Sequence, residues 1–157
     1  MKTVLILVKK TADKHISSLF DDYVDRIKHY MTFDLTVIPE LKNNRKLSEE
    51  QQKNLEGEQI IKCLQPGDVI VLLDEFGKEL RSVELANWLT TKMNTVNRRL
   101  VFIIGGPYGF SKQIYDKANE KLSLSKLTFS HQMVRLIFVE QLYRALTIIN
   151  NEPYHHE

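Results

Sequence analysis

The sequence predicts an α/β fold with a mostly parallel sheet and helices on both faces. Short apolar runs, rich in β-branched residues, alternate along the chain with segments whose apolar side chains recur at helical spacing. The apolar runs are nearly continuous, which is typical of strands buried on both faces. A chain of 157 residues, 43% of them hydrophobic, is expected to form one domain over residues 1–157. Ordinary topology rules predict that this domain is doubly wound and unknotted.

The first half of the chain is expected to contain two strands and two helices. Pro39 ends the second strand, because proline lacks the N–H that a strand ladder needs. Ser48, with Gln51 three residues later, resembles the capping box that opens a helix. The predicted elements are a strand at 3–8, a helix at 14–29, a strand at 33–38, a loop at 41–46 and a helix from 48 to about 64.

The second half repeats this alternation and ends in a long helix. Ser82 and Ser111 are expected to cap one helix each. Apolar and small hydroxylated residues alternate over 122–129; a strand is the simpler interpretation, and a loop that wraps a small polar ligand with its backbone is the other. The predicted elements are a turn at 66–68, strands at 69–73 and 100–104, and helices after 82, after 111 and over 131–150.

Composition excludes several classes of protein. No apolar run approaches the length of a membrane span, and the first apolar run is too short for a signal peptide, so a cytoplasmic location is expected. Cys63 is the one cysteine; it excludes an internal disulfide and a cysteine-based zinc cluster, and is expected to be buried on a helix face. The formal net charge of +2 does not indicate nucleic-acid binding, so any RNA contact must rest on local basic clusters.

The glycine-rich segment that follows the strand at 100–104 is the leading candidate for a binding site. Gly105, Gly106 and Gly109 come directly after buried apolar residues, and ligands of open α/β sheets bind outside the carboxyl ends of the strands. A tight turn would need the same residues. The acidic segment 74–79 leaves the preceding strand and is expected to line the same pocket. Its carboxylates do not favour a metal site, because no histidine lies nearby; no P-loop or dinucleotide fingerprint is present.

The C-terminal third carries several polar residues that suit chemistry. His131 lies at a helix start, and Arg135 and Arg144 are expected to be solvated and on different helix faces. Tyr154 and His155 follow Pro153, near an end where disorder is the default; packing against the surface would explain them without function. The helix at 131–150 has an apolar arc wider than one sheet face needs, which predicts contact with a second subunit.

Six short motifs, spread over the whole chain, together resemble one family. They are Leu-Asp-x-x-Gly-Lys at 73–78, Ile-Gly-Gly-Pro-x-Gly at 104–109, Leu-Ser-x-Ser-Lys-x-Thr at 122–128, His-Gln-Met-Val-Arg at 131–135, Glu-Gln-Leu-Tyr-Arg-Ala at 140–145 and Pro-Tyr-His at 153–155. The set resembles the ribosomal large-subunit pseudouridine N3-methyltransferase family (RlmH) of the SPOUT class. The resemblance implies a SPOUT-type α/β fold with a deep C-terminal trefoil knot, which replaces the unknotted expectation. It also implies a homodimer that binds S-adenosylmethionine.

The resemblance further implies a substrate and site residues. The substrate is N3 of a pseudouridine in 23S rRNA, in the helix 69 stem-loop of the assembled ribosome. Arg144, Tyr154 and His155 match positions that serve the target nucleotide; His155 is the candidate general base, Arg144 a stabilising cation and Tyr154 a stacking group. The matched cofactor pocket consists of Leu73, Gly105, Gly106, Leu124, Ser125, Lys126, Leu127, Thr128, Phe129 and Ser130. No metal site is implied, and His156 stands where some relatives carry arginine.

The alternative function is a non-catalytic RNA- or nucleotide-binding α/β module, which would explain the glycine and basic loops but not the Tyr-His end. A nicotinamide-dependent oxidoreductase is disfavoured, because its fingerprint is missing. The residues expected to gather at an RNA-facing surface are Lys9, Lys10, Lys42, Arg45, Lys46 and Arg135.

Overall fold

The computed structural model describes residues 1–42 and 44–157. Within them, five strands form one sheet in the order β2-β1-β4-β3-β5, and every strand pair is parallel. The strands are β1 (Lys2–Val8), β2 (Phe33–Ile38), β3 (Val69–Glu79), β4 (Arg99–Ile104) and β5 (Glu120–Ser123). The helices are α1 (Lys14–Lys28), α2 (Glu49–Lys62), α3 (Ser82–Thr95), α4 (Lys112–Lys117) and α5 (His131–Ile149), with a short 3₁₀ turn, η1 (Asn44–Lys46).

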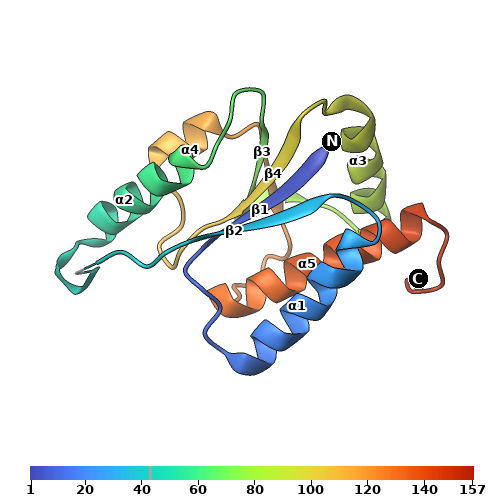
Figure 1. Cartoon of the computed structure of the whole chain (residues 1–157), viewed down its shortest axis with the longest axis horizontal. Coiled ribbons are helices and arrows are strands. Elements are labelled where there is room, and N and C mark those ends of the chain that lie inside the picture. The colour runs from blue at the N-terminus through green and yellow to red at the C-terminus, as the bar shows by residue number, and fades with distance from the viewer. Residues whose placement is uncertain (43) are drawn as a thin grey trace.

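The sheet lies between two layers of helices, as Figure 1 shows: α2 and α4 on one face, and α1, α3 and α5 on the other. Alternate residues of the central strands face opposite layers. Leu5 and Phe102 pack toward the α1/α3/α5 side, whereas Ile6 and Ile103 pack toward α2 and α4. The predicted α/β class with helices on both faces is therefore confirmed, and the trefoil knot stays a prediction.

Helix boundaries follow local capping chemistry. Ser48 and Gln51 form the predicted capping box: Gln51 N–H donates to Ser48 Oγ (3.1 Å) and Ser48 N–H donates to Gln51 Oε1 (2.9 Å). Ser111 caps α4 as predicted, accepting from Ile114 N–H. The prediction that Ser82 caps α3 is wrong by one residue: the N-cap is Arg81, whose N–H donates to Glu84 Oε2 at 2.6 Å.

Two further predictions need correction. The segment 74–79 is not simply a loop, because pairing with β5 resumes after a bulge: Leu122 lies opposite both Leu73 and Lys78. The alternating stretch 122–129 is only partly a strand: β5 ends at Ser123, and the remaining residues form a loop. Within the predicted loop at 41–46, η1 forms one turn, and Asn43 lies outside the described residues.

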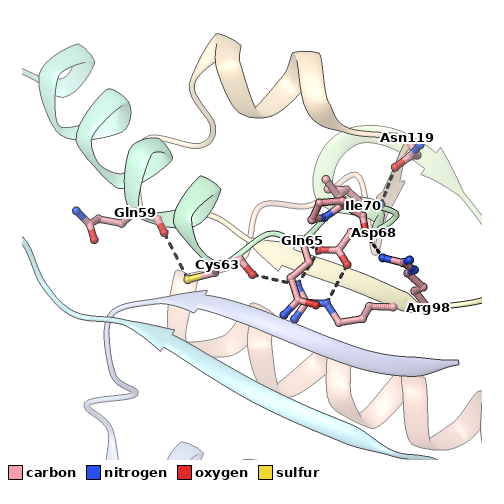
Figure 2. Close-up of polar contacts among 9 residues, drawn as sticks. Gln59, Cys63, Gln65, Asp68, Ile70, Arg98 and Asn119 are labelled. Atoms are coloured by element: carbon pink, nitrogen blue, oxygen red, sulfur yellow. Dashed lines mark hydrogen bonds and ion pairs between the residues drawn. The ribbon is translucent and has the colours of Figure 1, made fainter.

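Polar side chains close the amino-end edge of the sheet. Asp68 immediately precedes β3 and Arg99 opens β4; the Arg99 guanidinium donates to both Asp68 carboxylate oxygens (2.7 and 2.8 Å) and to Cys63 O (3.0 Å). Figure 2 shows the surrounding contacts, in which Gln65 N–H donates to Asp68 Oδ2 (2.8 Å) and Ile70 N–H donates to Asn119 Oδ1 (2.7 Å). Cys63 is half-buried at the C-cap of α2, where its Sγ donates to Gln59 O.

Among the described residues, no helix has the length and apolar character needed to cross a membrane.

Candidate functional site

A cavity of about 740 Å³ opens at the carboxyl-end edge of the sheet, where β3 and β4 end beside the loop that follows β5. Its walls come from residues 73–76, from the glycine loop 104–110 and from residues 124, 125 and 127–131. Of the ten residues predicted to bind the cofactor, nine line this cavity: Leu73, Gly105, Gly106, Leu124, Ser125, Leu127, Thr128, Phe129 and Ser130. Lys126 does not, because its side chain is 84% exposed and lies 3.8 Å from Glu79.

Two glycines of the glycine loop are required for different reasons. Gly109 has φ +80°, a conformation that other residues rarely adopt. Gly106 has no positive φ; a Cβ there would lie 2.6 Å from Glu56 Oε1, so a larger residue would first meet α2 rather than a bound ligand. The protein's own packing therefore requires glycine at position 106, whether or not a ligand approaches the loop.

Glu56 is a buried carboxylate next to the glycine loop that the sequence did not reveal. It is 4% exposed, and burial raises the pKa of its carboxyl despite the hydrogen bond from Gln52 and the charge of Lys9. Among the described residues, its Oε1 has no hydrogen-bond partner. The side chain supports the glycine loop from behind the cavity, so it is placed to fix the loop rather than to react.

The acidic residues on the cavity's β3 side are held by hydrogen bonds. Tyr115 Oη donates to Asp74 Oδ2 (2.6 Å), and burial together with this bond raises the Tyr115 pKa. Thr128 Oγ1 donates to Glu75 Oε2 (3.2 Å), which joins the loop after β5 to β3. Gly77 allows β5 itself to lie close to β3, because a Cβ would lie 2.7 Å from the Lys121 backbone carbon. Within the described ranges, no group of three potential metal ligands was found.

The loop 124–130 keeps its shape through short-range hydrogen bonds. Ser123 Oγ donates to Ser125 O, and Leu127 N–H donates to Ser125 Oγ, both at 2.9 Å. Ser130 then caps α5 by accepting from Met133 N–H (3.1 Å). The loop is therefore shaped by its serines, which leaves its inner surface to form a wall of the cavity.

Arg135 has a structural position, which contradicts its predicted place on an RNA-facing surface. Its side chain is completely buried, and burial lowers the pKa of its guanidinium. It donates to the backbone oxygens of Val8, Lys9 and His131 and to Thr11 Oγ1, at 3.0–3.1 Å. These bonds connect the end of β1 to the first turn of α5.

His131 lines the cavity, and its pKa is lowered by burial and by the nearby charges of Arg135 and Lys9.

The three predicted catalytic residues form a second cluster, the tail cluster: Arg144, Tyr154 and His155, with Glu140 between them. Glu140 Oε1 accepts from Arg144 Nη2 (2.6 Å) and from Tyr154 Oη (3.0 Å), while Arg144 Nη1 lies 3.2 Å from His155 Nδ1. The Arg144 guanidinium stacks over the Tyr154 ring, 4.7 Å from its centroid. The end of the chain is thus packed onto α5 in a defined arrangement.

The cavity and the tail cluster of one chain do not meet. Val134 lines the cavity and Arg144 lies ten residues later on the same helix, which is about 15 Å along the helix axis. Figure 1 shows the C-terminus beyond the end of α5 that lies away from the cavity loops. The structure therefore brings the predicted residues together in two groups, one for each predicted role, and leaves the groups of one chain apart.

The chain is similar to known proteins over nearly its whole length. A family model described as "Predicted SPOUT methyltransferase" matches residues 1–155. "Ribosomal RNA large subunit methyltransferase H" of Phocaeicola vulgatus is 68% identical, and the protein of that name from Bacteroides fragilis is 64% identical; each match covers 100% of both chains. The protein of that name from Christiangramia forsetii is 51% identical over 99% of both chains.

A solved structure described as a probable methylase family protein from Haemophilus influenzae shares the fold. It matches 99% of this chain and 70% of its own, with a TM-score of 0.51 and 13% identity. The match of the family model over nearly the whole chain, together with relatives more than half identical in sequence, shows that the chain belongs to the SPOUT methyltransferase family.

Proposed function

We propose that the protein is a methyltransferase of large-subunit ribosomal RNA, which transfers a methyl group from S-adenosylmethionine to N3 of a pseudouridine. The observation that carries this proposal is the cavity between the glycine loop and the loop 124–130, at the ends of parallel strands. The relatives named above, which the chain matches over its full length, are all named as ribosomal RNA large subunit methyltransferases. A large-subunit RNA substrate also accounts for the expected cytoplasmic location.

The cavity suits a methyl donor of the S-adenosylmethionine type. Its volume of about 740 Å³ lies within the range of sites for small organic cofactors. Leu73 and Leu124 offer apolar contact for a flat ring, and the backbone of residues 124–130 offers polar groups at its rim. When bound, the donor supplies an electrophilic methyl carbon: the N3 lone pair forms the new C–N bond, the C–S electron pair remains on sulfur, and the N3 proton is released.

The tail cluster suits the target nucleotide. The hydrogen bond to Glu140 raises the Arg144 pKa, so Arg144 stays cationic beside charge that develops on the base. Tyr154 is half-buried beside it and presents an aromatic surface for stacking. His155 completes the cluster with a ring nitrogen that has no hydrogen-bond partner among the described residues.

The distance between the two groups supports a homodimer with a composite site. The tail cluster cannot reach the cavity of its own chain while it is packed on α5, so we infer that a second copy brings its tail cluster to the cavity of the first. Large apolar side chains are exposed close to the cavity: Phe76 is 83% exposed, Leu127 73% and Met133 40%. Such side chains around a site are typical of a surface that another subunit covers.

The proposed function is tested by measuring methylation of ribosomes that carry the target pseudouridine. Ribosomes that carry uridine at that position are the matched control. We expect one methyl group per ribosome, located by mass spectrometry at N3, and no transfer to the uridine substrate. A protein that binds both cofactor and ribosomes without transfer would support the alternative, a non-catalytic binding module. The Ser125→Trp variant, which places a large side chain in the cavity wall, should lose cofactor binding in calorimetry.

A further inference from the structure

The contact between Arg144 and His155 determines where the histidine ring carries its proton. Arg144 Nη1 lies 3.2 Å from His155 Nδ1. A guanidinium nitrogen can only donate a hydrogen bond, so Nδ1 must be the acceptor in this pair. Because the hydrogen bond to Glu140 raises the Arg144 pKa, Arg144 stays a donor throughout the working pH range.

The neutral ring therefore carries its proton on Nε2. This atom is buried, and it has no hydrogen-bond partner among the described residues. Glu157 Oε1 lies 3.5 Å from Nε2, an ion pair when the ring is protonated, on a side chain that is 51% exposed. A buried N–H without a partner costs free energy, and a substrate acceptor that takes the place of the exposed Glu157 side chain beside it would recover this cost.

The position of Arg144 is itself fixed from the other side. Glu140 Oε1 accepts from Arg144 Nη2 and from Tyr154 Oη, and Tyr154 Oη lies 3.2 Å from Tyr23 Oη. The charged or titratable groups in direct contact with the pair are thus Glu140, Tyr154 and Glu157. This chain of contacts, from Glu140 through Arg144 to His155, holds the ring in one orientation and one tautomer.

We propose that His155 acts in methyl transfer as a hydrogen-bond donor through Nε2–H, to a carbonyl oxygen next to N3 of the target base. The proposal rests on the proposed function. N3 lies between two ring carbonyls, and the charge that develops as its proton leaves spreads onto both oxygens, where a fixed donor stabilises it. The N3 proton passes to water, because Nδ1 is occupied by Arg144 and Nε2 already carries a proton. Arg144 fixes the tautomer and is to that extent a positioning residue.

The first test locates the proton without any substrate. Nitrogen NMR of the ¹⁵N-histidine-labelled protein distinguishes the proton-bearing ring nitrogen from the bare one. We expect Nε2 to carry the proton in the wild type, and a mixture of tautomers in Arg144→Leu. A proton on Nδ1 in the wild type would overturn the proposal.

The second test separates a donor from a base by substitution. His155→Gln keeps an N–H near the position of Nε2 but cannot act as a base, whereas His155→Ala removes both. We expect His155→Ala to slow single-turnover transfer by a hundredfold or more, about the cost of losing one donor to a developing anion. His155→Gln should stay within about tenfold of the wild type, with the same pH–rate profile. The exposed neighbour His156→Gln is the matched control.

The outcomes are distinguishable. A His155→Gln variant as slow as His155→Ala would refute the donor role, and loss of an ionisation from its pH–rate profile would identify His155 as the base instead. Wild-type protein that transfers no methyl group would refute the proposed function, while the NMR experiment would still decide the tautomer.

Discussion

The two edges of the sheet contrast in how their polar groups are satisfied. At the amino-end edge, Asp68 and Arg99 bond to each other and to the turns around them, and their side chains are only 2% and 16% exposed. At the carboxyl-end edge, glycines and serines shape loops around a cavity of about 740 Å³. The same parallel strands thus begin at a set of mutually hydrogen-bonded side chains and end at an open cavity. We therefore expect substitutions at the first edge to affect stability and substitutions at the second to affect binding.

The largest expected effect concerns the tail cluster. Deletion of Tyr154 to Glu157 should reduce methyl transfer by at least a thousandfold, because it removes two of the three groups proposed to contact the target nucleotide, Tyr154 and His155. Cofactor binding should stay unchanged, because none of the four deleted residues lines the cavity. Stability should fall only modestly, through the lost contacts of Tyr154 with Tyr143 and Glu140. Single-turnover assays and calorimetry measure these outcomes; loss of cofactor binding would contradict the separation of the two groups.

The next effect concerns the amino-end edge. Asp68→Ala should lower the free energy of unfolding by about 3 kcal/mol, because it leaves the Arg99 guanidinium half-buried without its anion. The control is Asp34→Ala, which breaks an exposed pair with Lys2 and should cost about 0.5 kcal/mol or less. Urea unfolding measures both. Cofactor affinity should not change in either variant; a changed affinity would mean that the two edges are coupled.

The contact between Gly106 and Glu56 tests whether the glycine loop is fixed from behind. Gly106→Ala should cost about 1–3 kcal/mol, because the new methyl group would meet the buried carboxylate at 2.6 Å. In the Glu56→Ala background the same change should cost much less. A double-mutant cycle measures this coupling, and additive effects would show that Glu56 does not restrict the loop.

The smallest effect is a dependence on pH at the amino-end edge. Burial alone would raise the pKa of Asp68, but the bonds from Arg99 and from Gln65 N–H outweigh it and lower the pKa below its usual value. A carboxyl whose pKa is lowered on folding contributes stability above its unfolded pKa of about 3.9, and the contribution disappears as the pH falls through the folded value. The stability difference between wild type and Asp68→Ala should therefore be constant near neutrality and shrink in acid. A difference that grew in acid would contradict this assignment.

The sequence predicted those features that depend on local pattern. The helices, three strands (β1, β2 and β4) and the capping box at Ser48 follow from periodicity and short-range hydrogen bonds, so they were predicted to within a few residues. The far end of β3 and the bounds of β5 were not. Of the ten residues that the family resemblance predicted to bind the cofactor, nine line one cavity. The features that the sequence did not reveal depend on contacts between distant segments.

Three residues illustrate those distant contacts. Arg135 is completely buried because the end of β1 supplies its acceptors, 124 to 127 positions earlier in the chain. Position 77 of β3 requires glycine because the backbone of β5 lies too close for a side chain, and no local rule predicts that pairing. Glu56 looks like an ordinary helix residue, and only the glycine loop packed against it makes it a buried carboxylate.

The most direct test of the central claim, that the cavity of one chain works with the tail cluster of another, is a mixed dimer. One chain carries Ser125→Trp and the other lacks residues 154–157; each homodimer should be inactive. In a heterodimer purified by two different tags, one site combines an intact cavity with an intact tail, so we expect roughly half of the wild-type single-turnover amplitude. An inactive heterodimer would show that each tail serves its own chain, and would contradict the account.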